Sequence, residues 1–150
     1  MKLTKYTIER KYPVSADRLW AGFTDPDLLK QWIWGPGARD VQVERQLHLN
    51  GTFNISMDAG DTRWGMRGMY LVIEPGRKLI HTLHWDADVG YNGEGMNPLD
   101  EVIVVNIAPD GNGSSIEYIH MGIPDDGQSA PEHERSVRVT LDLLEKVITS

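Results

Sequence analysis

Residues 12–36, YPVSADRLWAGFTDPDLLKQWIWGP, carry the start signals of two short helices in immediate succession. Ser15 is a good N-cap for the first helix. Thr24, followed three residues later by Asp27, has the spacing of a capping box and predicts the start of the second helix. The two helices follow one strand-like segment and precede a long series of others. This unusual order of elements is the strongest indication of the fold.

Around these helices, the chain is rich in segments that predict β-strands. Thr4–Tyr12 and Val41–Leu49 alternate apolar and polar residues, as half-buried strands do. Asn50-Gly51 then predicts a two-residue hairpin turn, because both central residues of such a turn need positive φ. Asp86–Asp100 is predicted to be a loop, and its length suggests a function. The remaining predicted strands are 53–57, Arg63–Ile73, Lys78–Trp85, Glu101–Ala108 and Ser114–Met121.

The last segment predicts a long amphipathic helix, with a capping box formed by Ser129 and Glu132 at its start. Its apolar residues form two adjacent stripes that cover roughly 200° of the helix surface. A helix buried over so wide an arc needs a partner that curves around it, and a twisted sheet of six or seven antiparallel strands provides one. We therefore predict an α+β fold with a curved sheet around the C-terminal helix. The stripes are Val137, Leu141, Leu144 and Ile148, and Val139, Leu143 and Val147.

Composition limits the classes of function. A chain of 150 residues forms one domain with room for a cavity. Its net charge of -7 argues against nucleic acid as a partner, since phosphate binding needs clustered positive charge. The lack of cysteine excludes disulfides, thiolate metal sites and a cysteine nucleophile. Without a signal peptide or an apolar run of about 18 residues, we expect a cytoplasmic protein with no membrane partner.

With these elements in this order, the chain resembles the START-like (SRPBCC) superfamily and its helix-grip fold. It is most similar to the bacterial single-domain branch of the family named after the activator of heat-shock-protein-90 ATPase. The resemblance covers nearly the whole chain, so we expect residues 1–150 to form a single START-like domain. It is carried by Ile8, Arg10, Pro13–Trp20, Thr24-Asp25-Pro26, Trp32-Ile33-Trp34-Gly35-Pro36, Gly68, Glu74-Pro75, Thr82, Trp85 and residues 114–122.

The resemblance also implies a cavity between the C-terminal helix and the sheet. The last helix of the family often carries a Gly-Trp pair near its start, whereas this chain has Ser136-Val137-Arg138-Val139 there. The departure removes a bulky side chain and changes the expected shape of the cavity wall. Trp32 and Trp34 are predicted to anchor the short helices or to form the cavity mouth.

Period-2 positions on the apolar strand faces supply the candidate ligand-binding residues. Arg45 lies between Val43 and Leu47 on such a face, where a charge is costly unless it is paired or meets a polar pocket. A bulge or edge position that lets Arg45 reach water is the alternative. Core packing is the alternative for the other candidates, and a buried hydrogen bond is the alternative for the histidines. Those candidates are Trp64, Met66, Tyr70, His81, Trp85, Tyr118 and His120.

No catalytic residue, cofactor or metal site is predicted. His81 and His84 are three residues apart, so they point to opposite faces of a strand. His133 lies near two aspartates, Asp125 and Asp126, which we interpret as a coincidence of a loop. The chain has no Gly-x-Ser-x-Gly elbow, and its glycine-rich loop lacks the Lys-Ser/Thr of a phosphate-binding loop.

Three functional hypotheses follow. The first is binding of an apolar or amphipathic small molecule in the cavity. The second is an enzyme of the cyclase, dehydratase or hydrolase type, which would need Arg45, His81, Glu117 and His120 to converge on one void. The third is a chaperone-cofactor-like interaction protein, which only the family name suggests. A homodimer is the base-rate expectation for a soluble protein, and the fold alone selects none of the three functions.

Overall fold

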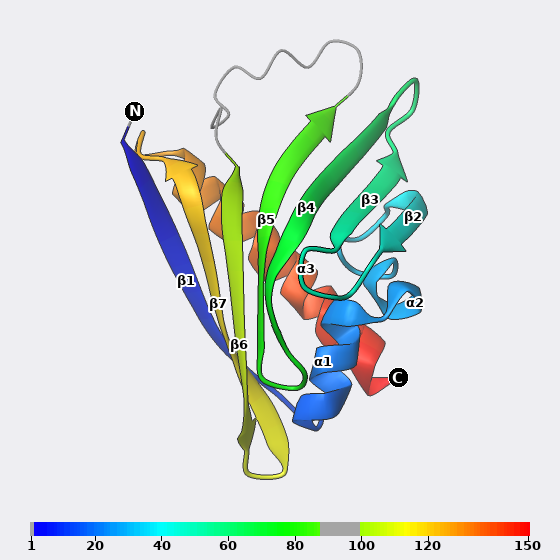
Figure 1. Cartoon of the computed structure of the whole chain (residues 1–150), viewed down its shortest axis with the longest axis vertical. Helices are drawn as coiled ribbons and strands as arrows, with labels where there is room; N and C mark the ends of the chain where they lie inside the picture. The colour runs from blue at the N-terminus through cyan, green and yellow to red at the C-terminus, as the bar shows by residue number, and fades with distance from the viewer. Residues whose placement is uncertain (1, 88–99) are drawn as a thin grey trace.

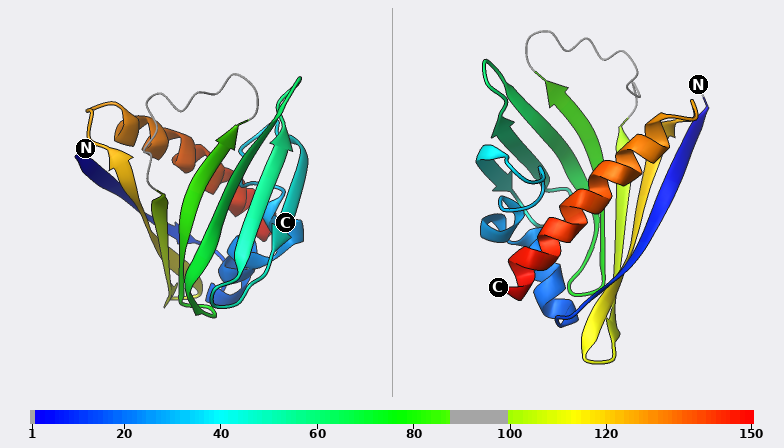
Figure 2. Two further views of the ribbon diagram at one scale, coloured as in Figure 1. Left: turned by 45° about the horizontal axis from the view of Figure 1, so that its top comes forward. Right: turned by 180° about the vertical axis from the view of Figure 1, so that it is seen from behind.

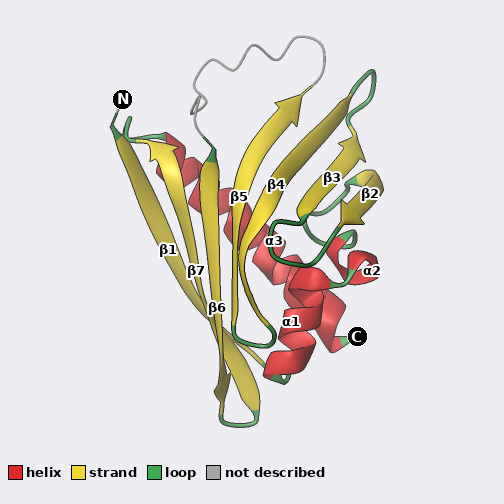
Figure 3. Cartoon of the chain, viewed as in Figure 1, coloured by secondary structure: helices red, strands yellow, loops and turns green. Residues whose placement is uncertain are grey.

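The computed structural model describes residues 2–87 and 100–150. A seven-stranded antiparallel sheet curves around the long C-terminal helix α3 (Ser129–Thr149), as Figures 1 and 3 show. The strand order is β1-β7-β6-β5-β4-β3-β2, so the first strand closes one edge by pairing with the last. The view from behind in Figure 2 shows α3 running across the concave face of the sheet. The predicted α+β helix-grip architecture is therefore confirmed.

The element order also agrees with the predicted order. The predicted loop at residues 86–100 falls mostly outside the described residues, and only its first two residues are seen as strand. Among the residues that the structure describes, no helix is long and apolar enough to cross a membrane. The elements before α3 are β1 (Leu3–Tyr12), α1 (Ala16–Thr24), α2 (Pro26–Leu29), β2 (Arg39–Arg45), β3 (Thr52–Asp58), β4 (Arg63–Glu74), β5 (Lys78–Ala87), β6 (Glu101–Asp110) and β7 (Gly113–Pro124).

The two short helices begin at side-chain caps. The Ser15 hydroxyl accepts a hydrogen bond from the backbone N–H of Arg18 at 3.1 Å, as predicted. The second cap is Asp25 and not Thr24, because the Asp25 carboxylate accepts from the N–H of Asp27 at 2.9 Å. The Thr24 hydroxyl instead donates back into the last turn of α1. Asp25 therefore ends α1 and starts α2, which explains why the two helices follow one another so closely.

Gly22 lets α1 pack closely against α3. A Cβ atom at this position would lie 2.8 Å from Leu144 Cδ1 and 3.0 Å from Ile148 Cγ2. The Gly22 carbonyl also accepts a hydrogen bond from the buried Trp32 indole at 2.8 Å. Trp32 thus ties the segment after α2 to α1, and the short helices pack together beside the C-terminal part of α3 (Figure 1).

The predicted two-residue turn between β2 and β3 is wrong. Strand β2 ends at Arg45 and β3 begins at Thr52, so residues 46–51 form the connection. Asn50 has a φ of 66°, but Gly51 is not in the left-handed region. Gly51 is required for a different reason, since a Cβ atom there would lie 1.9 Å from the Gln46 carbonyl oxygen. Close packing of the loop backbone replaces the hairpin turn.

Helix α3 buries a narrower face than its sequence predicts. Its buried residues are Leu141, Leu144, Val147 and Ile148. Val139, which belongs to the second predicted stripe, is 47% exposed. The sheet therefore encloses one side of the helix, and only part of the predicted apolar arc is buried.

The start of α3 is stabilised by Asp126 rather than by the predicted capping box. The Asp126 carboxylate accepts hydrogen bonds from the backbone N–H groups of Gln128 and Ser129 at 2.9 and 2.7 Å, and from the Ser129 hydroxyl at 2.6 Å. Ser129 lies inside the helix, and the N-cap residue Gln128 makes no side-chain cap bond. The bond from the Ser129 hydroxyl is the main cause that lowers the pKa of Asp126 to about 2.

Candidate functional site

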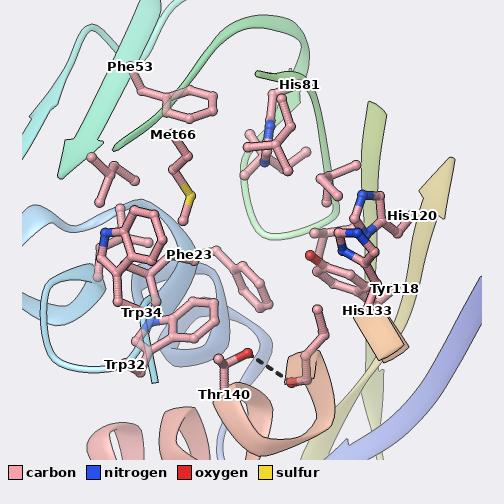
Figure 4. Close-up of a pocket in the computed structure, with 18 of the residues that line it drawn as sticks. Phe23, Trp32, Trp34, Phe53, Met66, His81, Tyr118, His120, His133 and Thr140 are labelled. Carbon is pink, nitrogen blue, oxygen red and sulfur yellow. Dashed lines mark hydrogen bonds between the residues drawn. The ribbon is translucent and has the colours of Figure 1, made fainter. Parts of the chain in front are cut away.

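A largely apolar cavity of about 270 Å³ lies between α3 and the concave face of the sheet (Figure 4). Strands β3 to β7 form one side of it. Helix α3 supplies the opposite side through Val137 and Thr140, and the short-helix region contributes Phe23, Trp32 and Trp34. The Thr140 hydroxyl donates to the Val137 carbonyl at 2.8 Å, so its proton is used within the helix. The cavity occupies the place that the family resemblance implies.

Six of the eight predicted site residues line this cavity: Met66, Tyr70, His81, Trp85, Tyr118 and His120. They come from β4, β5 and β7, on the strand faces that the period-2 pattern indicated. Burial raises the pKa of Tyr70 to about 12 and also raises that of Tyr118, so both phenols stay neutral at pH 7. The structure brings these side chains together, and their role in binding a ligand remains a prediction.

Arg45 does not line the cavity. It is the last residue of β2, the edge strand, and its Nε donates to the Thr24 carbonyl at 2.7 Å. Thr24 is the last residue of α1, where a cation is favourable because the carbonyls at that end of a helix lack partners. Arg45 thus occupies an edge position, which was the predicted alternative to a cavity site, and its charge lies at the end of a helix.

Trp64 also lies outside the cavity lining. It is the second residue of β4, beside the turn that joins β3 to β4, and it is 47% exposed. Met66 is the next residue on the same strand face and does line the cavity. The alternation of the strand is therefore as predicted, but the cavity does not extend to the end of β4.

His81 lies in an aromatic part of the wall. Its ring centroid is 4.8 Å from that of Phe53, at an interplanar angle of 80°. Its Nδ1 is 2.8 Å from the Thr82 carbonyl oxygen, so the neutral ring carries its hydrogen on Nδ1 and donates it there. Burial lowers the pKa of His81 to about 4. His81 is therefore an uncharged cavity residue at neutral pH.

Two tryptophans carry the unsatisfied polar groups of the cavity. The Nε1 atoms of Trp34 and Trp85 are buried and have no hydrogen-bond partner among the described residues. The ring centroids of the two indoles are 6.0 Å apart. A buried donor without a partner costs about 1–3 kcal/mol. Both tryptophans line the cavity, so these two N–H groups are donors beside its wall that a bound molecule would have to reach to satisfy.

A buried polar network lies at the β6–β7 side of the wall. His120 is 1% exposed, with its Nδ1 2.9 Å from the Tyr6 hydroxyl and its Nε2 2.7 Å from Glu101 Oε1. Burial raises the pKa of Tyr6, so the phenol remains protonated. The His133 ring stands edge-on to that of His120, with centroids 5.2 Å apart, and burial lowers the pKa of His133. Three strands and α3 thus bring a carboxylate, a phenol and two imidazoles together.

The polar set required by the enzyme hypothesis does not assemble. Of Arg45, His81, Glu117 and His120, only the two histidines line the cavity. Glu117 instead accepts a hydrogen bond from the side-chain amide of Asn106 at 3.0 Å. The carboxylate that does reach His120 is Glu101, which was not among the predicted site residues.

Sequence reasoning missed Glu101 and misjudged His133. Glu101 is 5% exposed and begins a predicted strand, where a carboxylate is unremarkable in the sequence. In the sequence, His133 stands near Asp125 and Asp126, whereas the structure places it against His120 and Trp85. Helical periodicity offered one signal, because His133, Val137 and Thr140 recur at the spacing of one helix face.

Solved structures of the same fold include proteins from several bacteria. Protein CV1439 of Chromobacterium violaceum is 21% identical, covers 97% of each chain and superimposes with a TM-score of 0.82. SA2116 of Staphylococcus aureus, a protein of unknown function, is 16% identical, covers 99% of this chain and 94% of its own, and gives 0.80. CalU16 of Micromonospora echinospora is 19% identical, covers 96% and 75%, and gives 0.69. At these identities, the likeness concerns the fold alone.

No functionally curated protein matches the chain. The family described as "Activator of Hsp90 ATPase homolog 1-like protein" matches residues 13–149. The match extends from the loop before α1 to the last residue of α3 and includes every element except β1. The chain therefore belongs to the Activator of Hsp90 ATPase homolog 1-like family.

Proposed function

We propose that this protein binds a small amphipathic molecule in the cavity between α3 and the sheet. The observation that carries the proposal is the pairing of an apolar wall with two buried indole N–H groups that lack partners. Ligand sites in proteins are mostly apolar, with a few placed polar groups that orient the ligand. The cavity has this character, and family membership is consistent with it.

The size of the cavity indicates a small ligand. Its volume of about 270 Å³ is just below the range of roughly 300–1,000 Å³ that is usual for small-molecule sites. An apolar cavity of roughly 150 Å³ holds a benzene molecule. We therefore expect a ligand of about two fused rings, or a medium-length alkyl chain, rather than a phospholipid or a sterol.

The polar contacts indicate the chemistry of the ligand's polar end. The indoles of Trp34 and Trp85 can only donate hydrogen bonds. They need an acceptor such as a carbonyl, ether or hydroxyl oxygen. His81, which also lines the cavity, is neutral because burial lowers its pKa to about 4. An uncharged acceptor therefore fits the wall better than a carboxylate does.

Blocking the cavity tests the proposal. Val137 lines the cavity, so Val137→Trp should place an indole in the space that a ligand would occupy. We expect the affinity for the uncharged fluorescent probe N-phenyl-1-naphthylamine to fall by at least about tenfold, which corresponds to about 1.4 kcal/mol. The matched control is Val139→Trp on the exposed side of the same helix, which should bind like the wild type.

Two outcomes would contradict this proposal. One is a wild-type protein that neither enhances the fluorescence of the probe nor retains a small molecule in native mass spectrometry after fresh purification. The other is equal probe binding by the Val137→Trp and Val139→Trp variants, because the probe would then bind outside the cavity.

The two indole donors give a second prediction, on ligand preference. Displacement of the probe by 2-decanone and by decane compares ligands that differ mainly in one carbonyl group. The wild type should prefer the ketone, since the ketone can accept a hydrogen bond from Trp34 or Trp85, and each such bond contributes about 0.5–1.5 kcal/mol. The variant with Trp34→Phe and Trp85→Phe should lose that preference and keep its affinity for decane. A preference that survives in the double variant would assign the polar contact to other residues.

A further inference from the structure

We propose that Glu101, His120 and His133 form a binding site for one divalent transition-metal ion of the Zn²⁺ class at the wall of the cavity. One ligand atom from each residue lies within 4.8 Å of the other two. The residues come from β6, β7 and α3, which are far apart in the sequence. Figure 4 shows the rings of His120 and His133 next to each other.

The donor set suits this class of ion. Two imidazoles and one carboxylate bind Zn²⁺ in catalytic sites, and the same types of ligand accept Co²⁺, Fe²⁺ and Ni²⁺. Glu101 and His120 are buried, and a buried carboxylate is costly unless it is paired with a positive charge. A divalent cation would supply that charge between the two histidines.

The geometry requires only a small adjustment. Ligands bound at about 2.0–2.2 Å around a tetrahedral ion stand roughly 3.3 Å apart. Glu101 Oε1 and His120 Nε2 are already 2.7 Å apart. The three ligand atoms all lie within 4.8 Å of one another. His133 is the least buried of the three residues and lies in the first turns of α3. Rotation of the His133 side chain is therefore the movement that would close the site.

Tyr6 provides the outer hydrogen bond that orients the buried imidazole. Its hydroxyl is 2.9 Å from Nδ1 of His120, and a hydroxyl can either donate or accept. When Nδ1 carries the hydrogen and donates it to Tyr6, the lone pair of Nε2 is free to bind an ion. Metal-binding histidines usually have such a partner on the second ring nitrogen.

The site would also face the cavity. His120 and His133 both line the cavity, so coordination positions not taken by the three residues would open toward it. Three protein ligands with an open position are typical of zinc sites that bind a further molecule. The inference does not depend on the proposed function, because an ion can bind here whether or not an organic molecule enters the cavity.

A surface cluster on the neighbouring strand provides a matched control. His84 lies 3.1 Å from Asp100 and 3.7 Å from Asp86, and all three side chains are well exposed. An imidazole and carboxylates are ligand types for the same ions, so this surface is the alternative site that the experiment must test. His84→Ala removes a histidine from that surface and leaves the buried cluster intact.

Titration with Co²⁺, followed by its visible absorption, tests the proposal on the full chain without a histidine tag. The wild type and His84→Ala should bind one equivalent with similar affinity, and Zn²⁺ should displace the Co²⁺. His133→Ala, whose folding circular dichroism can verify, should bind at least about tenfold more weakly. Tyr6→Phe should keep the stoichiometry and weaken binding by roughly tenfold or more, the usual effect of losing an outer-shell partner.

Three results would overturn the inference. They are a wild type that binds no Co²⁺, a folded His133→Ala variant that binds as well as the wild type, and loss of binding in His84→Ala, which would assign the metal to the surface. Binding of N-phenyl-1-naphthylamine by the metal-free protein is measured separately. Failure of the metal site and failure of the proposed ligand binding are therefore distinguished.

Discussion

Alanine at Gly68 is expected to destabilise the protein by at least about 3 kcal/mol, a large effect for one methyl group. A Cβ atom at this position would lie 2.0 Å from the Thr82 carbonyl oxygen and 2.7 Å from two ring atoms of Phe53. The carbonyl belongs to the backbone of the neighbouring strand and cannot move alone. Strands β4 and β5 would therefore have to separate at this point of the sheet.

The same contact also involves the cavity. The Thr82 carbonyl accepts from His81 Nδ1, and the Phe53 ring packs edge-on against His81. Gly68→Ala should therefore lower the affinity for N-phenyl-1-naphthylamine as well as the stability. At Gly68, the backbone of β5 and the Phe53 ring approach so closely that no side chain fits. Such close approach is a common reason for glycine inside a strand.

Urea unfolding followed by tryptophan fluorescence would measure this effect, and Gly65 provides a matched control on the same strand. A Cβ atom at Gly65 would meet nothing closer than 3.6 Å, which is ordinary contact. We expect Gly65→Ala to change the free energy of unfolding by no more than about 1 kcal/mol, partly because alanine restricts the unfolded chain. Equal stability of the two variants would mean that the sheet adapts around Gly68.

The fold was largely predictable because local signals agreed with one another. Alternation placed the strands, and the apolar stripe with Leu141 and Leu144 placed the helix that they enclose. The errors concern details that depend on partners. Asp25 caps α2, and Asp126 stabilises the start of α3 from outside the helix. Both contacts depend on the path of the backbone, which the pattern of serine, threonine and glutamate does not encode. Val139 looks like a core residue until the limited reach of the sheet is known.

Part of the candidate site could have been derived from strand register. Asp110 pairs with Gly113 across a tight turn, and the same register places Ile103 opposite His120. Glu101 lies two residues before Ile103 on the same strand face, and diagonal neighbours of this kind are within reach of long side chains. The pairing of Glu101 with His120 was therefore implicit in the turn. The contribution of His133 was not, since it depends on how α3 crosses the sheet.

The cavity itself depends on packing that no sequence pattern encodes. The paired tryptophans 32 and 34 look equivalent in the sequence, yet Trp32 donates to the Gly22 carbonyl whereas the Trp34 indole N–H has no partner among the described residues. Trp64 shares a strand face with Met66, and Arg45 pairs with Phe53 across β2 and β3, yet neither Trp64 nor Arg45 lines the cavity. Alternation gives the face of a residue, and the position along the strand decides whether that face meets a cavity.

Acidification should expose the cost of burying His81. Its pKa is lowered to about 4 in the folded protein, chiefly by burial and further by His120, while the Thr82 carbonyl opposes the shift. The ordinary value of 6.5 applies to the unfolded chain. The folded state therefore binds fewer protons between these values. The titration of His81 therefore leaves the free energy of unfolding unchanged above pH 6.5. As the pH falls toward 4, it lowers that free energy by up to about 3 kcal/mol.

His81→Phe removes this titration and keeps a planar ring against Phe53 and Tyr70. Carboxylates also protonate in this pH range, but they do so in both proteins. The informative quantity is therefore the difference in unfolding free energy between wild type and variant. We expect that difference to shift by about 3 kcal/mol in favour of His81→Phe between pH 7 and pH 4.

A variant of an exposed histidine, His48→Ala, separates burial from the mere presence of an imidazole. It should follow the wild-type profile across the same range, because its ring lies on the surface of the loop between β2 and β3. Parallel profiles for the wild type and His81→Phe would show that His81 gains protons as readily in the folded chain as in the unfolded one. The wall of the cavity would then be wet at His81, and a charged ligand headgroup would be as acceptable there as an uncharged acceptor.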